Sequence, residues 1–183
     1  MQYWNDLYVE IAEKITANMP NIQWIDLWHE QVNFLTEELP FPTPAVFIDF
    51  RTLGIDDRGT LAQDCDLQIN LYLFFETFSD TYHGAYNKDR ALEFLKELTN
   101  LHALFHGKNG NNYSELRRTQ MSREDSGGAG NLYRISFECL VTDDSAQTLF
   151  TETQNTNAEI VITSAKEEPE PPPEDDFFYI VDK

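Results

Sequence analysis

AQDCDLQINLYLFF, residues 62–75, is the clearest strand in the chain. Its apolar side chains alternate with polar ones: Cys65, Leu67, Ile69, Leu71 and Leu73 point one way, and Asp64, Asp66, Gln68 and Asn70 the other. A period of two is typical of a strand with one face on a core and one in water. The stretch therefore predicts a sheet with one solvated face.

The segments before it predict further strands. Residues 45–50, AVFIDF, form an apolar strand, and the preceding run 39–44, LPFPTP, leads into it as an extended linker because its prolines fix the backbone. Residues 53–60, LGIDDRGT, are expected to be the polar loop of a long hairpin whose tip projects. Residues 22–34, rich in tryptophan and branched side chains, are expected to be an earlier strand.

Two amphipathic helices are also predicted. The first places apolar side chains at three- and four-residue spacing from Trp4 to Met19 and is stopped by Pro20. The second spans residues 89–106, with Asn87 as its N-cap and Gly107 at its end. Its expected apolar stripe is Ala91, Leu95, Leu98, His102 and Phe105.

Residues 114–122 and 133–141 complete the set as two strands, joined by a glycine-rich hairpin loop at 126–131. The order αβββαββ predicts an α+β fold, an antiparallel β-sheet with two helices packed on one face. We expect residues 1–150 to form this domain. Residues 151–183 are expected to be an acidic, proline-rich C-terminal extension.

The charge balance excludes one class of partner. The formal net charge is −19, and the last eighteen residues supply only −5 of it, so the folded part is acidic too. A surface of this sign repels phosphate backbones, which makes ordinary nucleic-acid binding unfavourable, although DNA can pass beside it without binding. No signal peptide or membrane segment is expected, and the cytoplasm is the expected site of synthesis.

The C-terminal stretch 166–183, KEEPEPPPEDDFFYIVDK, has seven acids, two lysines and four prolines, with five consecutive apolar or aromatic residues near its end. Such a composition does not bury enough apolar surface to fold by itself. Its last apolar residues need a surface to bury against, so we expect them to dock on a partner. They are Phe177, Phe178, Tyr179, Ile180 and Val181.

No pattern predicts an enzyme, a metal site or a cofactor. His102 and His106 have the spacing of two zinc ligands on a helix, but no third ligand is identifiable, and histidines at a helix end usually interact with its dipole. No serine or cysteine lies in a nucleophile motif. Cys65 and Cys139 fall in apolar alternation and are expected to be buried free thiols.

Basic residues gather at one place in this acidic chain: Arg117 and Arg118, with Arg123 nearby. One hypothesis is a head-to-tail contact between copies, in which this strand meets the acidic hairpin tip at Asp56, Asp57 and Arg58. The alternative is an exposed strand whose long charged side chains keep it soluble and unpaired.

The order of these elements resembles the bacteriophage tail terminator or tail completion proteins. The shared features are the N-terminal helix, the proline-rich entry into residues 45–50, the long acidic hairpin, the helix ending at residues 104–107 and the closing β-hairpin. The resemblance covers residues 1–150. The acidic extension is not part of the family's pattern.

The resemblance implies a virion structural protein without catalytic residues, assembled in the bacterial host cytoplasm and located in the tail and neck. It implies a six-membered ring that caps the tail tube, ends tube polymerisation and connects tail to head. The expected partners are other copies of the chain, the tail tube protein, the neck or head-completion proteins and the sheath, with DNA passing through the lumen. The alternative is a soluble, non-enzymatic adaptor that recruits one partner through its C-terminal peptide.

Overall fold

A five-stranded sheet in the order β1-β2-β3-β5-β4 carries the fold. The computed structural model describes residues 3–34, 41–76, 80–128 and 130–149. The strands are β1 (Trp24–Leu27), β2 (Ala45–Gly59), β3 (Ala62–Phe75), β4 (Arg117–Glu124) and β5 (Asn131–Asp143). The helices are α1 (Tyr3–Asn18), α2 (Lys88–Ala91) and α3 (Glu93–Phe105), with short 3-10 turns at Gln31–Phe34 and Ser145–Leu149. The α+β class and the order of helices and strands are as predicted.

One pair of strands makes the sheet mixed, where an antiparallel sheet was predicted. β1 runs parallel to β2, from Trp24 opposite Ala45 to Leu27 opposite Ile48, and every other neighbouring pair is antiparallel. A parallel pair needs a crossover, which the segment 28–44 supplies. β1 is therefore much shorter than the predicted strand 22–34.

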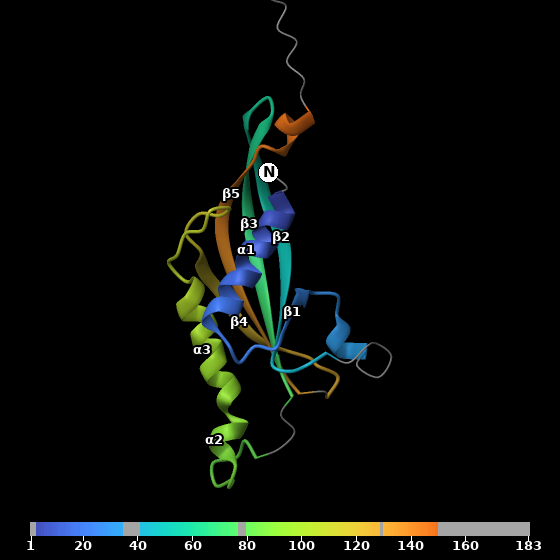
Figure 1. Cartoon of the computed structure of the whole chain (residues 1–183), viewed down its shortest axis with the longest axis vertical. Helices are drawn as coiled ribbons and strands as arrows, with labels where there is room; N and C mark the ends of the chain where they lie inside the picture. Colours follow the sequence, from blue (N-terminus) through green and yellow to red (C-terminus); the bar gives the residue numbers. More distant parts are fainter. Residues whose placement is uncertain (1–2, 35–40, 77–79, 129, 150–183) are drawn as a thin grey trace, which may run out of the picture. The chain divides into compact units, whose positions relative to one another are not determined.

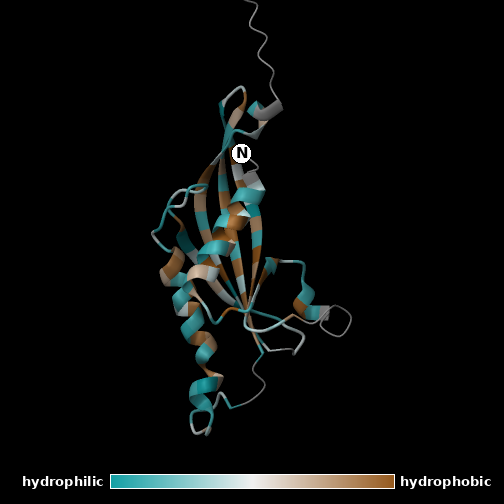
Figure 2. Ribbon diagram, viewed as in Figure 1, coloured by the Kyte–Doolittle hydropathy of each residue, from teal (hydrophilic) through white to brown (hydrophobic). Residues whose placement is uncertain are grey.

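α1 and α3 lie over the same face of the sheet (Figure 1). α1 contributes Leu7, Ile11, Ile15 and Met19 to the core, and α3 contributes Phe94, Leu98, Leu101 and Phe105. They pack on the apolar side chains of β3 and β5, among them Ile69, Leu71, Ile135 and Phe137. Along the strands apolar and polar residues alternate (Figure 2), so this helical face is apolar while the opposite face is largely polar.

A second, smaller core lies on the opposite face. It is formed by the buried residues Val32, Ala45, Phe47, Tyr72, Phe74 and Leu132. Trp28 and Phe41 pack against it. Trp28 stacks on Tyr72 at 4.2 Å between ring centroids, and Phe41 lies edge-on to Phe47 at 5.0 Å. No helix of the described residues lies over the rest of this face (Figure 1).

Two boundary predictions were wrong. Residues 53–59 are not a loop: β2 continues through them, paired with β3 apart from two irregularities, between Thr52 and Gly54 and between Asp57 and Gly59. The turn is confined to residues 60–61. The predicted second helix is two helices, because Leu92 separates α2 from α3. Of its expected apolar stripe, Ala91, Leu98 and Phe105 are buried. Leu95 is exposed, whereas Phe94 and Leu101 are buried. Asn87 stands before α2 without a side-chain capping bond.

Candidate functional site

The hairpin of β2 and β3 carries unbalanced negative charge at its far end. Arg58 is neutralised within the chain, because its guanidinium lies 3.5 Å from Asp64 and donates a hydrogen bond to Thr142. Asp57 accepts a hydrogen bond from Gln63 at 2.9 Å, but within the described residues no cation pairs with Asp57 or Asp56. Both aspartates are exposed. The predicted acidic tip therefore exists, without Arg58 as a free charge.

β4 presents the opposite charge. Arg117 pairs with Glu115 at 3.0 Å, while Arg118 and Arg123 form no ion pair in the part of the chain that the structure describes. All three arginines are exposed. β2 and β4 lie on opposite sides of β3 and β5 in the sheet. The two predicted clusters are thus not brought together within one copy.

β4 is also the last strand, and only its beginning is closed. The segment after α3 turns back along it: Gly107 donates to the carbonyl of Leu116 and Leu116 to that of Lys108. The backbone N–H of Arg118 donates to Nδ1 of His106 at 3.0 Å. From Thr119 to Glu124 the outer side of the strand has no hydrogen-bond partner among the described residues. An unpaired edge of this kind is a template for another strand.

A second open edge lies on the hairpin half of β2. The parallel partner β1 ends opposite Ile48, and the last bond on that side joins the N–H of Trp28 to the Ile48 carbonyl. Beyond it, residues 50–57 have no described strand on their outer side. Ile55, in the middle of this stretch, is 55% exposed.

β1 differs, because side chains close its backbone. Tyr8 donates from its hydroxyl to the Ile25 carbonyl, Asp26 accepts from the Leu27 N–H, and Gln31 donates to the Leu27 carbonyl. Side chains that satisfy an edge strand are a common defence against unwanted pairing. The open edges are therefore confined to residues 50–57 of β2 and 119–124 of β4 within the described residues.

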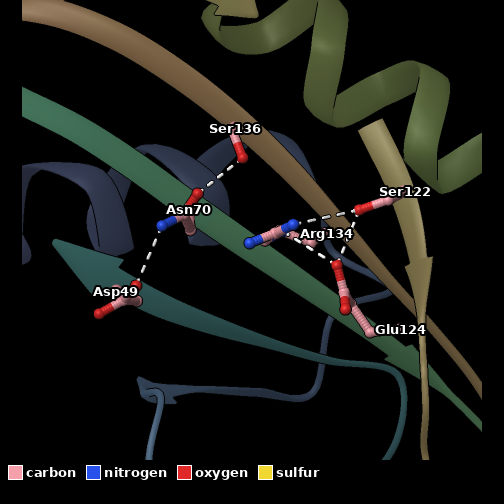
Figure 3. A network of polar contacts seen from close by, with 6 residues as sticks. All are labelled: Asp49, Asn70, Ser122, Glu124, Arg134 and Ser136. Atoms are coloured by element: carbon pink, nitrogen blue, oxygen red, sulfur yellow. Dashed lines mark hydrogen bonds and ion pairs between the residues drawn. The ribbon is translucent and has the colours of Figure 1, made fainter. Parts of the chain in front are cut away.

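The exposed sheet face holds a polar network (Figure 3). The hydroxyl of Ser136 donates to Asn70 Oδ1 at 2.6 Å, and Asn70 donates from Nδ2 to Asp49 at 3.0 Å. Ser136 is 1% and Asn70 3% exposed. These two buried hydrogen bonds therefore join β2, β3 and β5 to one another. Arg134 lies beside it, with Nε 3.0 Å from Glu124 Oε1.

The two histidines act as structural groups. Their ring centroids are 4.7 Å apart, and His106 is held by the backbone of Arg118. The pKa of His102 is lowered, first by burial of the ring and then by the positive charges of Arg118 and His106. Its Nδ1 is buried without a hydrogen-bond partner among the described residues. No group of three or more metal-ligating side chains occurs in the described chain.

Neither thiol is activated. Cys65 and Cys139 are both buried and free, as predicted. Burial raises the pKa of Cys139 to about 12, and burial with nearby aspartates raises that of Cys65. A thiol that stays protonated is a poor nucleophile.

A polar pocket of about 710 Å³ lies between α2, α3 and the segment that enters β2. Its deepest charged group is Glu97, only 4% exposed, which accepts hydrogen bonds from Asn21 at 3.0 Å and Asn100 at 3.1 Å. Among the described residues, the lining contains no serine, cysteine or histidine.

Sequence reasoning missed the open edge of β2 and the residues that flank it. It treated residues 53–60 as a loop, and loops do not offer strand edges. The missed side chains with the clearest exposure are Ile55 on β2 and Met121 on β4, 55% and 51% exposed. The alternation Thr119–Arg123 was the available signal for Met121. The predicted docking segment Phe177–Val181 lies outside the described residues.

Comparisons with known proteins leave the family open. No family model matches the chain, and no curated protein matches it. Among solved structures, the chain is similar to one from a structure described as the virion of a native gene transfer agent particle. That similarity has a TM-score of 0.49 at 7% identity and covers 78% of this chain and 98% of the other. No helix of the described residues is long and apolar enough to cross a membrane.

Proposed function

We propose that this chain is a structural virion protein that forms a ring on the tail tube, ends its polymerisation and connects the tail to the neck. The observation that carries the ring is the pair of open strand edges on opposite sides of one sheet, acidic on β2 and basic on β4. Two different complementary surfaces on one subunit give head-to-tail association, which closes into a ring when the rotation allows it. The resemblance in element order supplies the tail location and the number six.

The chain's charge suits a passage for DNA. With a net charge of −19, a channel lined by this protein repels the phosphate backbone and does not retain it. The sheet face without helices is the natural lining, because α1 and α3 occupy the other face. It carries Asp49, Asp64, Asp66 and Glu138.

The native mass of the full-length protein tests the ring. We expect a species of six subunits that grows with protein concentration and dissociates at high salt, since the contact joins exposed charges. Reversal of one side, Arg118→Asp or Asp57→Arg, should abolish that species, and the two reversals together should restore it. A matched control is Arg90→Asp, an exposed arginine on α2 away from both edges.

The C-terminal segment is proposed to attach the ring to a different protein. Phe177, Phe178, Tyr179, Ile180 and Val181 would dock on a tube, neck or sheath subunit as an added strand or in a groove. Removal of residues 166–183 should leave the melting temperature and the ring unchanged while weakening binding to that subunit. Unchanged affinity for tube, neck and sheath proteins would refute this role.

The second candidate is an adaptor that uses the same C-terminal peptide without any ring. It is favoured by the composition of residues 166–183, which need a partner surface whether or not the domain assembles. An adaptor remains monomeric and tolerates charge reversal at both edges. The native mass of the Asp57→Arg and Arg118→Asp variants therefore separates the two functions.

A further inference from the structure

We infer that neighbouring copies join by strand pairing, with β4 of one copy added to the hairpin half of β2 of the next in a single register. This inference rests on the proposed ring and specifies its contact. The occupant of each open edge is thus a second copy of this chain.

The strand directions allow the pairing. β2 is antiparallel to β3, β3 to β5 and β5 to β4, so β2 and β4 run in opposite directions. A rotation about the ring axis keeps neighbouring copies in nearly the same orientation. β4 of one copy therefore meets β2 of the next as an antiparallel pair, which lets the sheet continue from copy to copy.

The two edges are offset along the sheet, so the copies must be staggered. Glu124 of β4 pairs with Leu132 of β5, which pairs with Phe74 of β3, so Glu124 and Phe74 lie at the same level. Arg51 of β2 pairs with Gln68 of β3, which lies six residues from Phe74 toward the β2–β3 turn. The open part of β2 begins at the level of Ile69, beyond the end of β1. Without a stagger, β4 would face the part of β2 that β1 already covers.

Side-chain direction restricts the stagger to an even number of residues, because an odd shift turns one strand's side chains to the other face. A shift of six brings three complementary pairs of side chains to the same level, two of them inside the open stretches. Glu124 meets Arg51 as described above. Met121, level with Leu71, meets Ile55, which pairs with Cys65.

The third pair lies at the other end. Arg118 lies just before the open stretch and its backbone N–H is bonded to His106, so the contact here is made by its exposed side chain alone. That side chain is level with Ile69, and the shift brings it to Asp57, which pairs with Gln63. The shift of six thus joins two opposite-charge pairs around one contact between exposed apolar side chains. Glu124 remains available for this, since Arg134 and Ser122 engage its Oε1 and Oε2 has no partner among the described residues.

Neighbouring even shifts fit worse. A shift of four sets Glu124 opposite Asp49, two like charges, and Arg118 opposite the apolar Ile55. A shift of eight carries Arg118 past the hairpin turn and sets Met121 opposite Asp57. Directly opposed unlike charges stabilise a strand pair and like charges destabilise it, which favours six.

The same stagger has the size that a closed ring requires. Each copy contributes four strands to the continuous sheet, β2, β3, β5 and β4. Six residues at ~3.3 Å span about 20 Å along the strands, and four strand spacings of ~4.8 Å span about 19 Å across them. The strands then tilt by about 45° from the ring axis, close to the ~35–45° typical of closed barrels.

Disulfide cross-linking tests the register. Directly opposite residues of an antiparallel pair have Cα atoms roughly 4.5–5.5 Å apart, within disulfide range. The test variant is the full chain with Ile55→Cys and Met121→Cys. It also carries Cys65→Ala, because Cys65 lies opposite Ile55 within the same copy and would capture the new thiol. Each substituted surface residue is at least half exposed, so the fold should persist.

After mild oxidation we expect a ladder of covalent oligomers ending in a closed ring on a denaturing, non-reducing gel. Each variant that carries only one of the two new cysteines, in the same Cys65→Ala background, should remain monomeric on that gel. The matched control pairs Ile55→Cys with Arg123→Cys, which shares the face of Met121 but lies two residues out of register; its yield should be several-fold lower.

The outcomes separate this inference from the proposed function. A six-subunit species by native mass, with equal or no cross-linking from the in-register and out-of-register pairs, overturns the strand pairing and leaves the ring standing. A monomer by native mass at all concentrations, with no ladder, overturns both. A ladder from the in-register pair alone supports both.

Discussion

Replacement of Ser136 by alanine should destabilise the domain more than its small size suggests. Ser136 is 1% exposed and its hydroxyl is the donor to Asn70 Oδ1 at 2.6 Å. Alanine leaves that oxygen buried without a described donor, at a cost of about 1–3 kcal/mol. For a domain of this size each kcal/mol lowers the melting temperature by roughly 2–4 °C. We expect a decrease of about 4–8 °C for a loss of about 2 kcal/mol.

Urea and thermal unfolding of the full chain measure the effect, and a double variant tests its cause. Asn70→Val in the Ser136→Ala background removes the Asn70 Oδ1 that has lost its donor. Asp49 also loses its bond from Asn70, but it is only partly buried and can bind water instead. Replacing both partners should recover part of the lost stability. If Ser136→Ala melts with the wild type, or if the double variant is worse than the sum of the singles, the buried hydrogen bond does not contribute as argued. Ring formation should be unaffected in every case.

Three further predictions concern other parts of the domain. Since the pKa of His102 is below its usual 6.5, the unfolded chain binds the proton more readily; stability should fall as the pH drops below about 6.5, and His102→Gln should flatten that dependence in urea titrations. Glu10→Ala removes the acceptor of three hydrogen bonds from residues 111–112, at 2.7, 3.0 and 2.8 Å, and should cost about 1.5–3 kcal/mol by urea unfolding. Gly130→Ala should lower the melting temperature, because a Cβ there would lie 2.6 Å from the carbonyl oxygen of Phe75, whereas Gly59→Ala, with open space around it, should not.

The strand at residues 62–75 was predictable because its alternation reflects a real difference between its two faces. The hairpin half of β2 was not predictable in this way, because both of its faces are exposed to solvent. Leu53 and Ile55 are exposed among polar neighbours, so apolar and polar residues do not alternate with a period of two. Pairing with β3 holds this half as a strand despite Gly54. Sequence periodicity records burial, and strand pairing in solvent leaves little trace in it.

The apolar stripe of the second helix was predicted only in part. The buried positions keep an unbroken spacing of three and four residues across the break at Leu92: Ala91, Phe94, Leu98, Leu101 and Phe105. Phe94 is therefore buried in place of the predicted Leu95. The charge clusters on the hairpin and on β4 were visible in the sequence. That they flank open edges on opposite sides of the sheet follows only from the strand order β1-β2-β3-β5-β4.

The signs of the two edges also decide which assemblies are excluded. A two-fold dimer pairs identical edges, and a β2–β2 contact would gather Asp56 and Asp57 of both copies. A β4–β4 contact would gather Arg118 and Arg123 of both, so both dimers place like charges across a strand pair. Only β2 with β4 joins unlike charges, and that contact leaves one edge of each kind free to continue the chain of subunits. A dimer should therefore not accumulate as the final species in native mass spectra at low salt. A dimer that stays a dimer as the protein concentration rises would contradict the assignment of both edges.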